Sequence, residues 1–235
     1  MTPAMLTFDV FGTVVDWHTS VTREGEQLAA EWGLDGIDWA AFATAWRGRY
    51  GPSMAPIRDG RRPWIRLDVL HRENLVATLA EFGVEGLSDA QIDHFNRAWH
   101  RLDPWPDSVA GLTRLKSRCI VAALSNGNVE LIVNMAKHGG LPWDVVLGAE
   151  PARQYKPHPD AYLRSAAIMG LAPEECMMVA AHPSDLDSAA ALGFRTAYVH
   201  RPAEMGPGRT VEMPARDDFD FSSSSLEDLA GQLGC

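Results

Sequence analysis

The sequence LTFDVFGTVVDW, residues 6 to 17, places a single carboxylate at the end of an apolar run. Asp9 is followed by a glycine-threonine turn, and the residue two positions after it is Phe11, which has no proton to donate. A carboxylate in this position can act as a nucleophile and form an ester. Without a general acid beside it, we expect Asp9 to displace a leaving group that departs without a proton. The alternative is an ordinary turn or helix-capping aspartate.

Other side chains with chemical potential follow later apolar runs. Ser125 and Asn126 stand in LSNGN, Lys156 in QYKPHP, and His182 and Asp185 in AAHPSD. An ammonium group stabilises a nearby ionised carboxylate, and an imidazole can accept a proton near neutral pH. Each residue also has a plainer interpretation, since Ser and Asn are common in turns and Lys at surfaces. Their convergence on one place would favour a reactive site.

The apolar runs predict how these residues are positioned. Near-continuous runs are typical of buried parallel strands, and they occur at 5–10, 119–124, 145–148, 176–181 and 196–199. Helical stretches are expected between them, at 107–117, 128–138, 159–169 and 184–192. This alternation predicts an α/β fold with a doubly wound, Rossmann-like parallel sheet. Ligands bind beyond the carboxyl ends of such strands, so the polar residues above should meet at one sheet edge.

The segment 16–102 breaks the alternation of strands and helices. Apolar residues recur there at helical spacing, a Ser-x-x-Gln capping box starts at Ser88, and no strand-like run interrupts them. We therefore expect an all-helical cap domain of residues 16–102, inserted after the first strand. Residues 1–15 and 103–235 would then form the core domain.

Composition limits the classes of partner and the compartment. The net charge of −10 argues against nucleic acid or an anionic membrane surface as a partner, but leaves small anionic substrates open. The three cysteines show no paired spacing, the N-terminus has no basic signal region, and no apolar stretch is long enough to span a bilayer. We expect a cytoplasmic protein with reduced thiols. Association into a homodimer is left open.

Four ordered motifs, FDVFGTVVD, LSNG, YKP and HPSD, resemble those of the haloacid dehalogenase superfamily, and the resemblance covers essentially the whole chain. The nearest branch is that of the type II L-2-haloacid dehalogenases. This resemblance implies hydrolysis of short 2-haloalkanoates, such as haloacetates and (S)-2-haloacids, to 2-hydroxy acids through an ester on Asp9. The superfamily's phosphatases carry a second Asp where this chain has Phe11. A halide needs no proton to leave, so Phe11 favours the dehalogenases.

The fourth motif bears on metal binding. Magnesium-dependent relatives have a GDxxxD pattern after the last motif's strand, whereas this chain has Ala180 and Ala181 there and keeps only Asp185. Asp9 and Asp185 alone supply few carboxylates for a hard divalent cation, so we expect no metal and no cofactor. Two rival functions remain: a phosphatase of the same fold, and a non-catalytic homologue that binds a small ligand.

The resemblance implies further roles for individual residues. Lys156 would keep Asp9 ionised, and Thr13 would hydrogen-bond in the Asp9 region. Arg47 of the cap would face the departing halide, although three other arginines compete for this role: Arg49, Arg58 and Arg61. The substrate would be contacted by residues of the first, second and third motifs: Val10, Phe11, Ser125, Asn126 and Tyr162.

His182 departs from the family pattern. Well-known L-2-haloacid dehalogenases have Ser and Asn near the fourth strand, where this chain has Ala180 and His182. We expect His182 to take over activation of the water that cleaves the ester, with Asp185 as the next candidate. A catalytic base needs an orienting partner, and Asp16 in the first-motif loop is the candidate, unless it caps the first cap helix.

Overall fold

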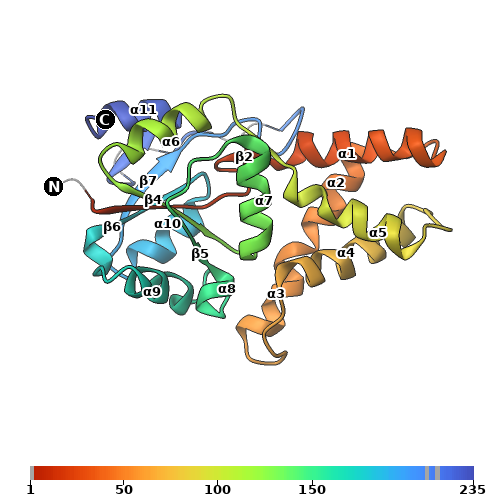
Figure 1. The fold of residues 1–235 in the computed structure, drawn as a ribbon, viewed down its shortest axis with the longest axis horizontal. Coiled ribbons are helices and arrows are strands. Elements are labelled where there is room, and N and C mark those ends of the chain that lie inside the picture. The colour runs from red at the N-terminus through yellow and green to blue at the C-terminus, as the bar shows by residue number, and fades with distance from the viewer. Residues whose placement is uncertain (1–2, 210–211, 215–217) are drawn as a thin grey trace.

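The centre of the molecule is a six-stranded parallel sheet. The computed structural model describes residues 3–209, 212–214 and 218–235. The strand order is β5-β4-β1-β6-β7-β8 (Figure 1). The strands are β1 (Met5–Phe8), β4 (Ile120–Ser125), β5 (Val145–Gly148), β6 (Cys176–Ala180), β7 (Arg195–Val199) and β8 (Phe221–Ser223). The five predicted strands are confirmed, and β8 was not expected because its sequence, FSS, is short and mostly polar.

Helices cover both faces of this sheet, which confirms the doubly wound α/β fold (Figure 1). One hydrophobic cluster includes Leu112, Leu131 and Leu226, and the other includes Ala161 and Leu186. Long apolar side chains on each helix therefore pack against one face of a sheet that is buried on both sides. The helices are α6 (Ser108–Lys116), α7 (Val129–Gly139), α8 (Ala149–Ala152), α9 (Pro159–Ile168), α10 (Pro183–Ala190) and α11 (Leu226–Gln232).

The register of the central strands brings the first, second and fourth motifs together. Phe8 of β1 lies between Ala123 of β4 and Val179 of β6. The residues that follow these strands are therefore neighbours at one edge of the sheet. Strand β1 is completely buried, as expected for the middle of a parallel sheet.

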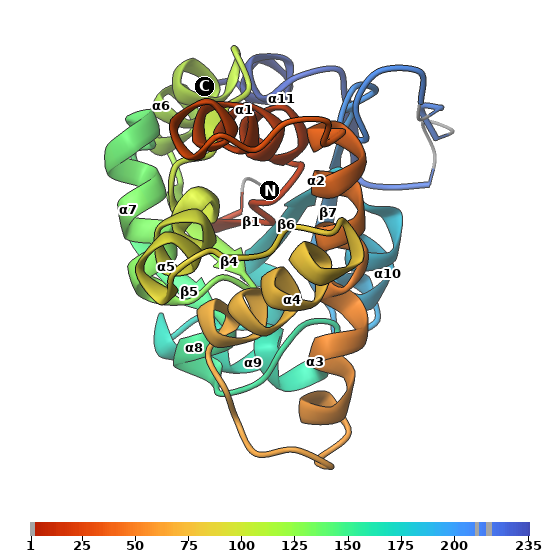
Figure 2. The same cartoon turned by 90° about the vertical axis from the view of Figure 1, so that its right-hand side faces the viewer.

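The inserted segment is all helical and lies over the carboxyl ends of the strands (Figure 2). The chain leaves and returns through a short antiparallel ribbon of β2 (Val15–Asp16) and β3 (Asp103–Pro104). The predicted capping box at Ser88 is confirmed. The division of the inserted segment from the core as a separate domain stays a prediction. The helices are α1 (Trp17–Trp32), α2 (Trp39–Gly48), α3 (Tyr50–Arg58), α4 (Leu67–Glu81), α5 (Asp89–Asn96) and the 3-10 helix η1 (Arg97–His100).

None of the helices in the described ranges is long and apolar enough to cross a membrane.

Gly148, the last residue of β5, lies opposite Ser125 of β4, and this close approach gives a test of the fold. Gly148 has φ +101°, and a Cβ there would lie 2.2 Å from the backbone oxygen of Ser125. Gly140 has φ +68° with nothing within 4 Å of a Cβ. Gly148→Ala should lower the unfolding free energy by on the order of 3 kcal/mol or more, because a clash with backbone adds to strain. Gly140→Ala should cost about 1–2 kcal/mol from strain alone. Urea unfolding measures both, and equal losses would contradict the close approach.

Candidate active site

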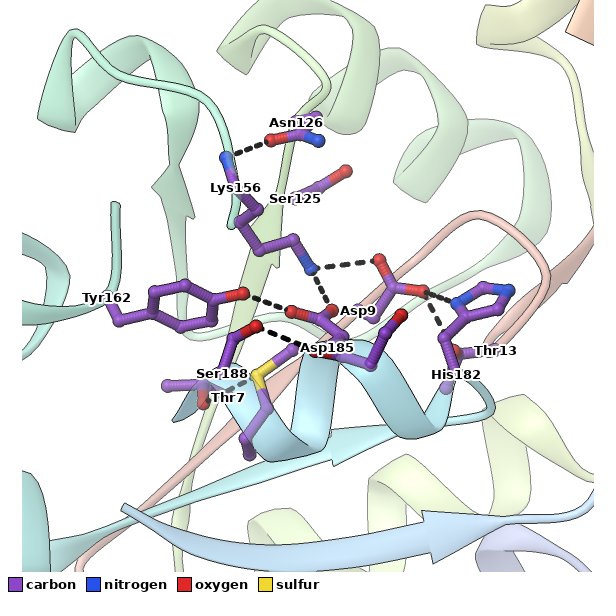
Figure 3. A network of polar contacts seen from close by, with 12 residues as sticks. Thr7, Asp9, Thr13, Ser125, Asn126, Lys156, Tyr162, His182, Asp185 and Ser188 are labelled. Carbon is purple, nitrogen blue, oxygen red and sulfur yellow. Dashed lines mark hydrogen bonds and ion pairs between the residues drawn. The ribbon is translucent and has the colours of Figure 1, made fainter. Parts of the chain in front are cut away.

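Asp9 follows β1 directly, and both oxygens of its carboxylate are held by donors (Figure 3). Lys156 Nζ lies 3.0 Å from Oδ1. Oδ2 accepts a hydrogen bond of 2.9 Å from the Thr13 hydroxyl and lies 3.0 Å from Nδ1 of His182. The side chain is thus fixed in orientation at the carboxyl end of the sheet.

The loop after β1 is tied to the end of β6 by Thr13. The Thr13 hydroxyl accepts a hydrogen bond of 2.9 Å from the Ala181 backbone N–H and donates its own proton to Asp9. The Asp9 N–H donates to the carbonyl of Val179 at 3.0 Å. A turn at Gly12, with φ +87°, lets the chain fold back over this edge.

Lys156 connects Asp9 to the third and fourth motifs. Its ammonium group contacts both Asp9 and Asp185, and its backbone N–H donates to Asn126 Oδ1 at 2.7 Å. Burial alone would lower the pKa of Lys156, but Asp185 and Asp9 outweigh burial and raise it. Burial raises the pKa of Asp9, but Lys156 and His182 outweigh that effect and lower it. Near neutral pH, Asp9 is therefore a carboxylate and Lys156 an ammonium ion.

Asp185 and Tyr162 support Lys156 from behind. The Tyr162 hydroxyl donates to Asp185 Oδ1, and Asp185 Oδ2 contacts the Lys156 ammonium group (Figure 3). Burial is the largest influence on the pKa of Tyr162 and raises it, so the hydroxyl stays protonated and can donate. Tyr162 acts here on Asp185 rather than on the space in front of Asp9.

His182 lies between two carboxylates. Its Nδ1 faces Asp9, and its Nε2 lies 2.9 and 3.1 Å from the two oxygens of Glu204. Burial would lower the pKa of His182, but hydrogen bonds and charges from Asp9 and Glu204 raise it to about 10. His182 is therefore an imidazolium ion near neutral pH. In this state it donates protons and does not accept one.

Of the two roles considered for Asp16, capping of α1 is confirmed, and the expected pairing with His182 was wrong. Its Oδ1 accepts from the backbone N–H of Thr19 at 3.0 Å. A carboxylate in the first turn of a helix satisfies backbone donors that otherwise lack partners. Glu204 pairs with His182 instead and also accepts from the Trp17 indole N–H at 3.2 Å.

Glu204 was not found from the sequence, since it lies in a loop with no periodic pattern. Arg201 anchors that loop by donating to the Thr13 carbonyl at 2.8 Å and to both oxygens of Asp107. The one usable signal is Gly12, where a Cβ would lie 2.0 Å from Glu204 Oε1. The backbone needs a glycine at position 12, but the sequence does not show which side chain lies against it.

A cavity of about 260 Å³ opens in front of Asp9. Val10, Phe11, Ser125 and Tyr162 are buried behind its wall rather than among its lining residues. The Ser125 hydroxyl oxygen accepts from the Gly127 N–H at 3.0 Å, as in a strand-to-helix turn. The expected contact of Ser125 with the substrate stays a prediction. The lining residues are Asp9, Arg47, Tyr50, Asn126, Lys156, Pro157, His182, Ser184, Asp185 and Ser188.

Arg47 is the arginine that the cap contributes to this cavity. Its guanidinium carbon lies 4.0 Å from the ring centre of Tyr50 and 5.8 Å from that of Phe11. Its buried Nη1 has no hydrogen-bond partner within the described part of the chain. The competing arginines are engaged elsewhere: Arg49 with Glu81, Arg61 with Asp59, and Arg58 with the Lys156 carbonyl.

The groups around Asp9 are cations and donors rather than further metal ligands. Lys156, Thr13 and His182 occupy both oxygens of its carboxylate. Within residues 3–209, 212–214 and 218–235, no three or more His, Cys, Asp or Glu side chains are grouped to hold a metal ion. Metal independence remains a prediction, which the chemistry of these donors favours.

Comparison with known proteins now identifies the family. The family model of haloacid dehalogenase-like hydrolases matches residues 4–193. The chain belongs to this family. It is 30% identical to (S)-2-haloacid dehalogenase 4A of Burkholderia cepacia, over 83% of this chain and 81% of that protein. A solved defluorinating L-2-haloacid dehalogenase superposes with a TM-score of 0.95 at 46% identity, covering 99% of this chain and 96% of the other.

Two other relatives bear on the chemistry. The L-2-haloacid dehalogenase of Xanthobacter autotrophicus, solved with chloropropionic acid covalently bound, superposes with a TM-score of 0.80 at 25% identity over 99% of this chain and 98% of that one. Hexitol phosphatase A of Escherichia coli is 30% identical over 94% of this chain and 91% of that protein. The chain is thus more similar to the defluorinating dehalogenase, at 46% identity, than to the phosphatase, at 30%, and the site residues give an independent distinction.

The contact between His182 and Glu204 predicts a measurable change in pKa. Glu204→Gln removes one of the two negative charges that hold the imidazolium, so the pKa of His182 should fall from about 10. NMR titration of the His182 ring would measure the shift. Glu130→Gln, which alters only an exposed carboxylate paired with Arg66 and Arg97, should leave this pKa unchanged. An unchanged pKa in Glu204→Gln would mean that Glu204 does not hold the proton on His182.

Proposed function

We propose that the enzyme is an (S)-2-haloacid dehalogenase that hydrolyses short 2-haloalkanoates, including haloacetates, to 2-hydroxy acids. The observation that carries this proposal is Phe11, which is 1% exposed and stands two residues after Asp9. An alkoxide leaving group needs a proton from that position, whereas a halide does not. The dehalogenases among its relatives, one of them solved with covalently bound chloropropionic acid, support the same reaction.

In the first step, a carboxylate oxygen of Asp9 attacks C2 of the substrate from the side opposite the halogen. A carbon–oxygen bond forms, the carbon–halogen bond breaks, and the halide leaves with the electron pair, inverting C2. Lys156 and Thr13 keep Asp9 ionised and oriented for this attack. Arg47 supplies positive charge for the departing halide from the cap side of the cavity.

Ester formation changes the charge state of His182. The ester of Asp9 carries no negative charge, so one of the groups that raise the pKa of His182 is lost. Glu204 still holds the proton on Nε2, so the proton on Nδ1 is the one released to solvent. The freed Nδ1 faces the carboxyl group of Asp9 and can accept a proton from water.

In the second step, water attacks the ester carbon of Asp9 and gives its proton to His182. The tetrahedral intermediate collapses, and the 2-hydroxy acid leaves with a proton returned by the imidazolium. Asp9 is left as a carboxylic acid that carries one oxygen from water, and its proton passes to His182, which restores the carboxylate and the imidazolium. Glu204 acts as the orienting group that a general base requires.

We also propose a cytoplasmic enzyme without a nucleic-acid partner. All three cysteines are free, and Cys119 and Cys176 are buried, which fits a reducing compartment. The net charge of −10 opposes nucleic-acid binding. Association into a homodimer stays a prediction of the sequence.

A pair of assays tests the reaction against its phosphatase rival. Wild-type enzyme should release halide from chloroacetate, should do so equally in EDTA, and should gain nothing from magnesium, because Asp9 is already surrounded by cations. It should not hydrolyse p-nitrophenyl phosphate with magnesium. Loss of halide release in EDTA with rescue by magnesium would overturn metal independence. Phosphatase activity without halide release would overturn the proposed function, and neither activity would point to a binding protein.

His182→Ala separates the two chemical steps. Attack by Asp9 needs no base, whereas ester hydrolysis should slow by about 10²–10⁴-fold, the usual contribution of a positioned general base. The variant should release up to one equivalent of halide per site and then accumulate an ester on Asp9. Intact mass spectrometry would show an adduct equal to the substrate minus hydrogen halide.

Asp9→Asn is the control for the adduct, since an amide is a poor nucleophile and should give neither halide nor adduct. If His182→Ala turned over near the wild-type rate, the base would be another group, with Asp185 the next candidate. If it gave neither burst nor adduct, His182 would act before the ester forms.

A further inference from the structure

Tyr50 is the cap residue that lines the reactive cavity beside the cap arginine, Arg47. It is the first residue of α3 and lines the cavity. The guanidinium carbon of Arg47 lies 4.0 Å from the centre of its ring, close enough for a cation–π interaction. The ring is itself flanked by Phe11 at 6.2 Å and His71 at 5.9 Å between ring centres. Its position is therefore fixed from both core and cap.

The surroundings of the Tyr50 ring leave Arg47 as the cation of this corner. His71 is 1% exposed, and burial, assisted by the charge of Arg47, lowers its pKa to about 3. His71 is thus neutral and does not repel the guanidinium group. With Nη1 unpartnered among the described residues, the Arg47 guanidinium keeps a donor for an anion.

Tyr50 of the cap and Asn126 of the core line the same cavity. Asn126 Oδ1 accepts from the Lys156 N–H at 2.7 Å, so its NH₂ group remains available as a donor. The Tyr50 hydroxyl can likewise donate its proton to an acceptor in the cavity. Burial is the largest influence on the pKa of Tyr50 and raises it, so the hydroxyl keeps this proton near neutral pH.

The cavity lining therefore includes two sets of donors that can reach an anion: Tyr50 belongs to the first set, and its ring contacts the second. Lys156 and His182 are already bound by carboxylates of the enzyme. The Tyr50 hydroxyl with the Asn126 amide can donate to one anion, and the Arg47 guanidinium can donate to another. A 2-haloalkanoate presents two such groups on adjacent carbons: a carboxylate and a developing halide.

We propose that Tyr50 determines substrate specificity in two separable ways: its hydroxyl, beside Asn126, binds the substrate carboxylate, and its ring fixes Arg47 at the departing halide. This inference rests on the proposed dehalogenase function. Tyr50 thereby sets the spacing between the carboxylate and halide sites. Substrates with the halogen farther from the carboxylate would not match it.

Two substitutions separate the roles of hydroxyl and ring, and the probes are acetate and bromide. NMR titration of the full chain gives a dissociation constant for each anion. Tyr50→Phe should weaken acetate by about 10-fold or more, the effect of losing a hydrogen bond to a charged group, and change bromide less than twofold. Tyr50→Leu should weaken both acetate and bromide, since Arg47 loses its ring. In turnover of chloroacetate, Tyr50→Phe should mainly raise KM, and Tyr50→Leu should also lower kcat.

Tyr198→Phe is the matched control. Tyr198 lies on β7, outside the cavity, and its hydroxyl contacts His200. Loss of this hydroxyl should leave both dissociation constants unchanged. Unchanged acetate binding in Tyr50→Phe would overturn the role of the hydroxyl, and unchanged bromide binding in a folded Tyr50→Leu would overturn that of the ring. If Tyr50→Leu does not fold, bromide binding in Arg47→Lys, which keeps the charge but loses the planar contact with the ring, decides in its place. Halide release by wild-type enzyme is scored separately, so failure of the proposed function and failure of the Tyr50 inference are distinguishable.

Discussion

The structure depends on keeping Asp9 ionised although its carboxylate is buried, with only 7% of the residue exposed. An ionised group can be buried only when opposite charges and hydrogen bonds replace its hydration. Lys156 and Thr13 supply these at once, and His182 does so in its charged form. Thr13 lies in the loop after β1, Lys156 follows β5 and α8, and His182 follows β6. The strand order β5-β4-β1-β6 therefore brings the compensating groups to one edge of the sheet.

The charges around the cavity balance, and this balance explains why the cap is needed. Three carboxylates (Asp9, Asp185 and Glu204) face three cations (Lys156, His182 and Arg47). In the proposed reaction, displacement of halide moves one negative charge from Asp9, on the core side, toward Arg47, on the cap side. The total charge is unchanged, so the barrier depends on whether a cation lies where the charge arrives. The buried Phe11 ring packs beside the Arg47 guanidinium group, 5.8 Å from its carbon, and so helps to hold it on that side.

The sequence alone was sufficient for residues that directly follow a strand. Asp9, Asn126 and His182 were expected to meet because parallel strands end at one edge, and the structure brings them together. Glu204 and Tyr50 were not found, because a loop anchored by Arg201 and the packing of cap helices position them, and neither leaves a periodic pattern. Asp16 was expected to pair with His182 because it lies in the first-motif loop, but it caps α1 instead. The pairing of Lys156 with Asp9 was expected from the motifs and is present, whereas contacts made by residues outside the motifs were not predicted.

The position of His182 between two carboxylates also resolves an apparent conflict in its role. A base that begins the reaction protonated, with a pKa of about 10, would be useless if its surroundings never changed. Its first carboxylate partner, however, is the nucleophile itself, and that charge disappears when the ester forms. The second partner, Glu204, takes no part in bond making and keeps the ring oriented throughout. The same imidazole can therefore stabilise Asp9 as an anion in the first step and accept a proton from water in the second. An amide at this position could donate to Asp9 but could not make that exchange.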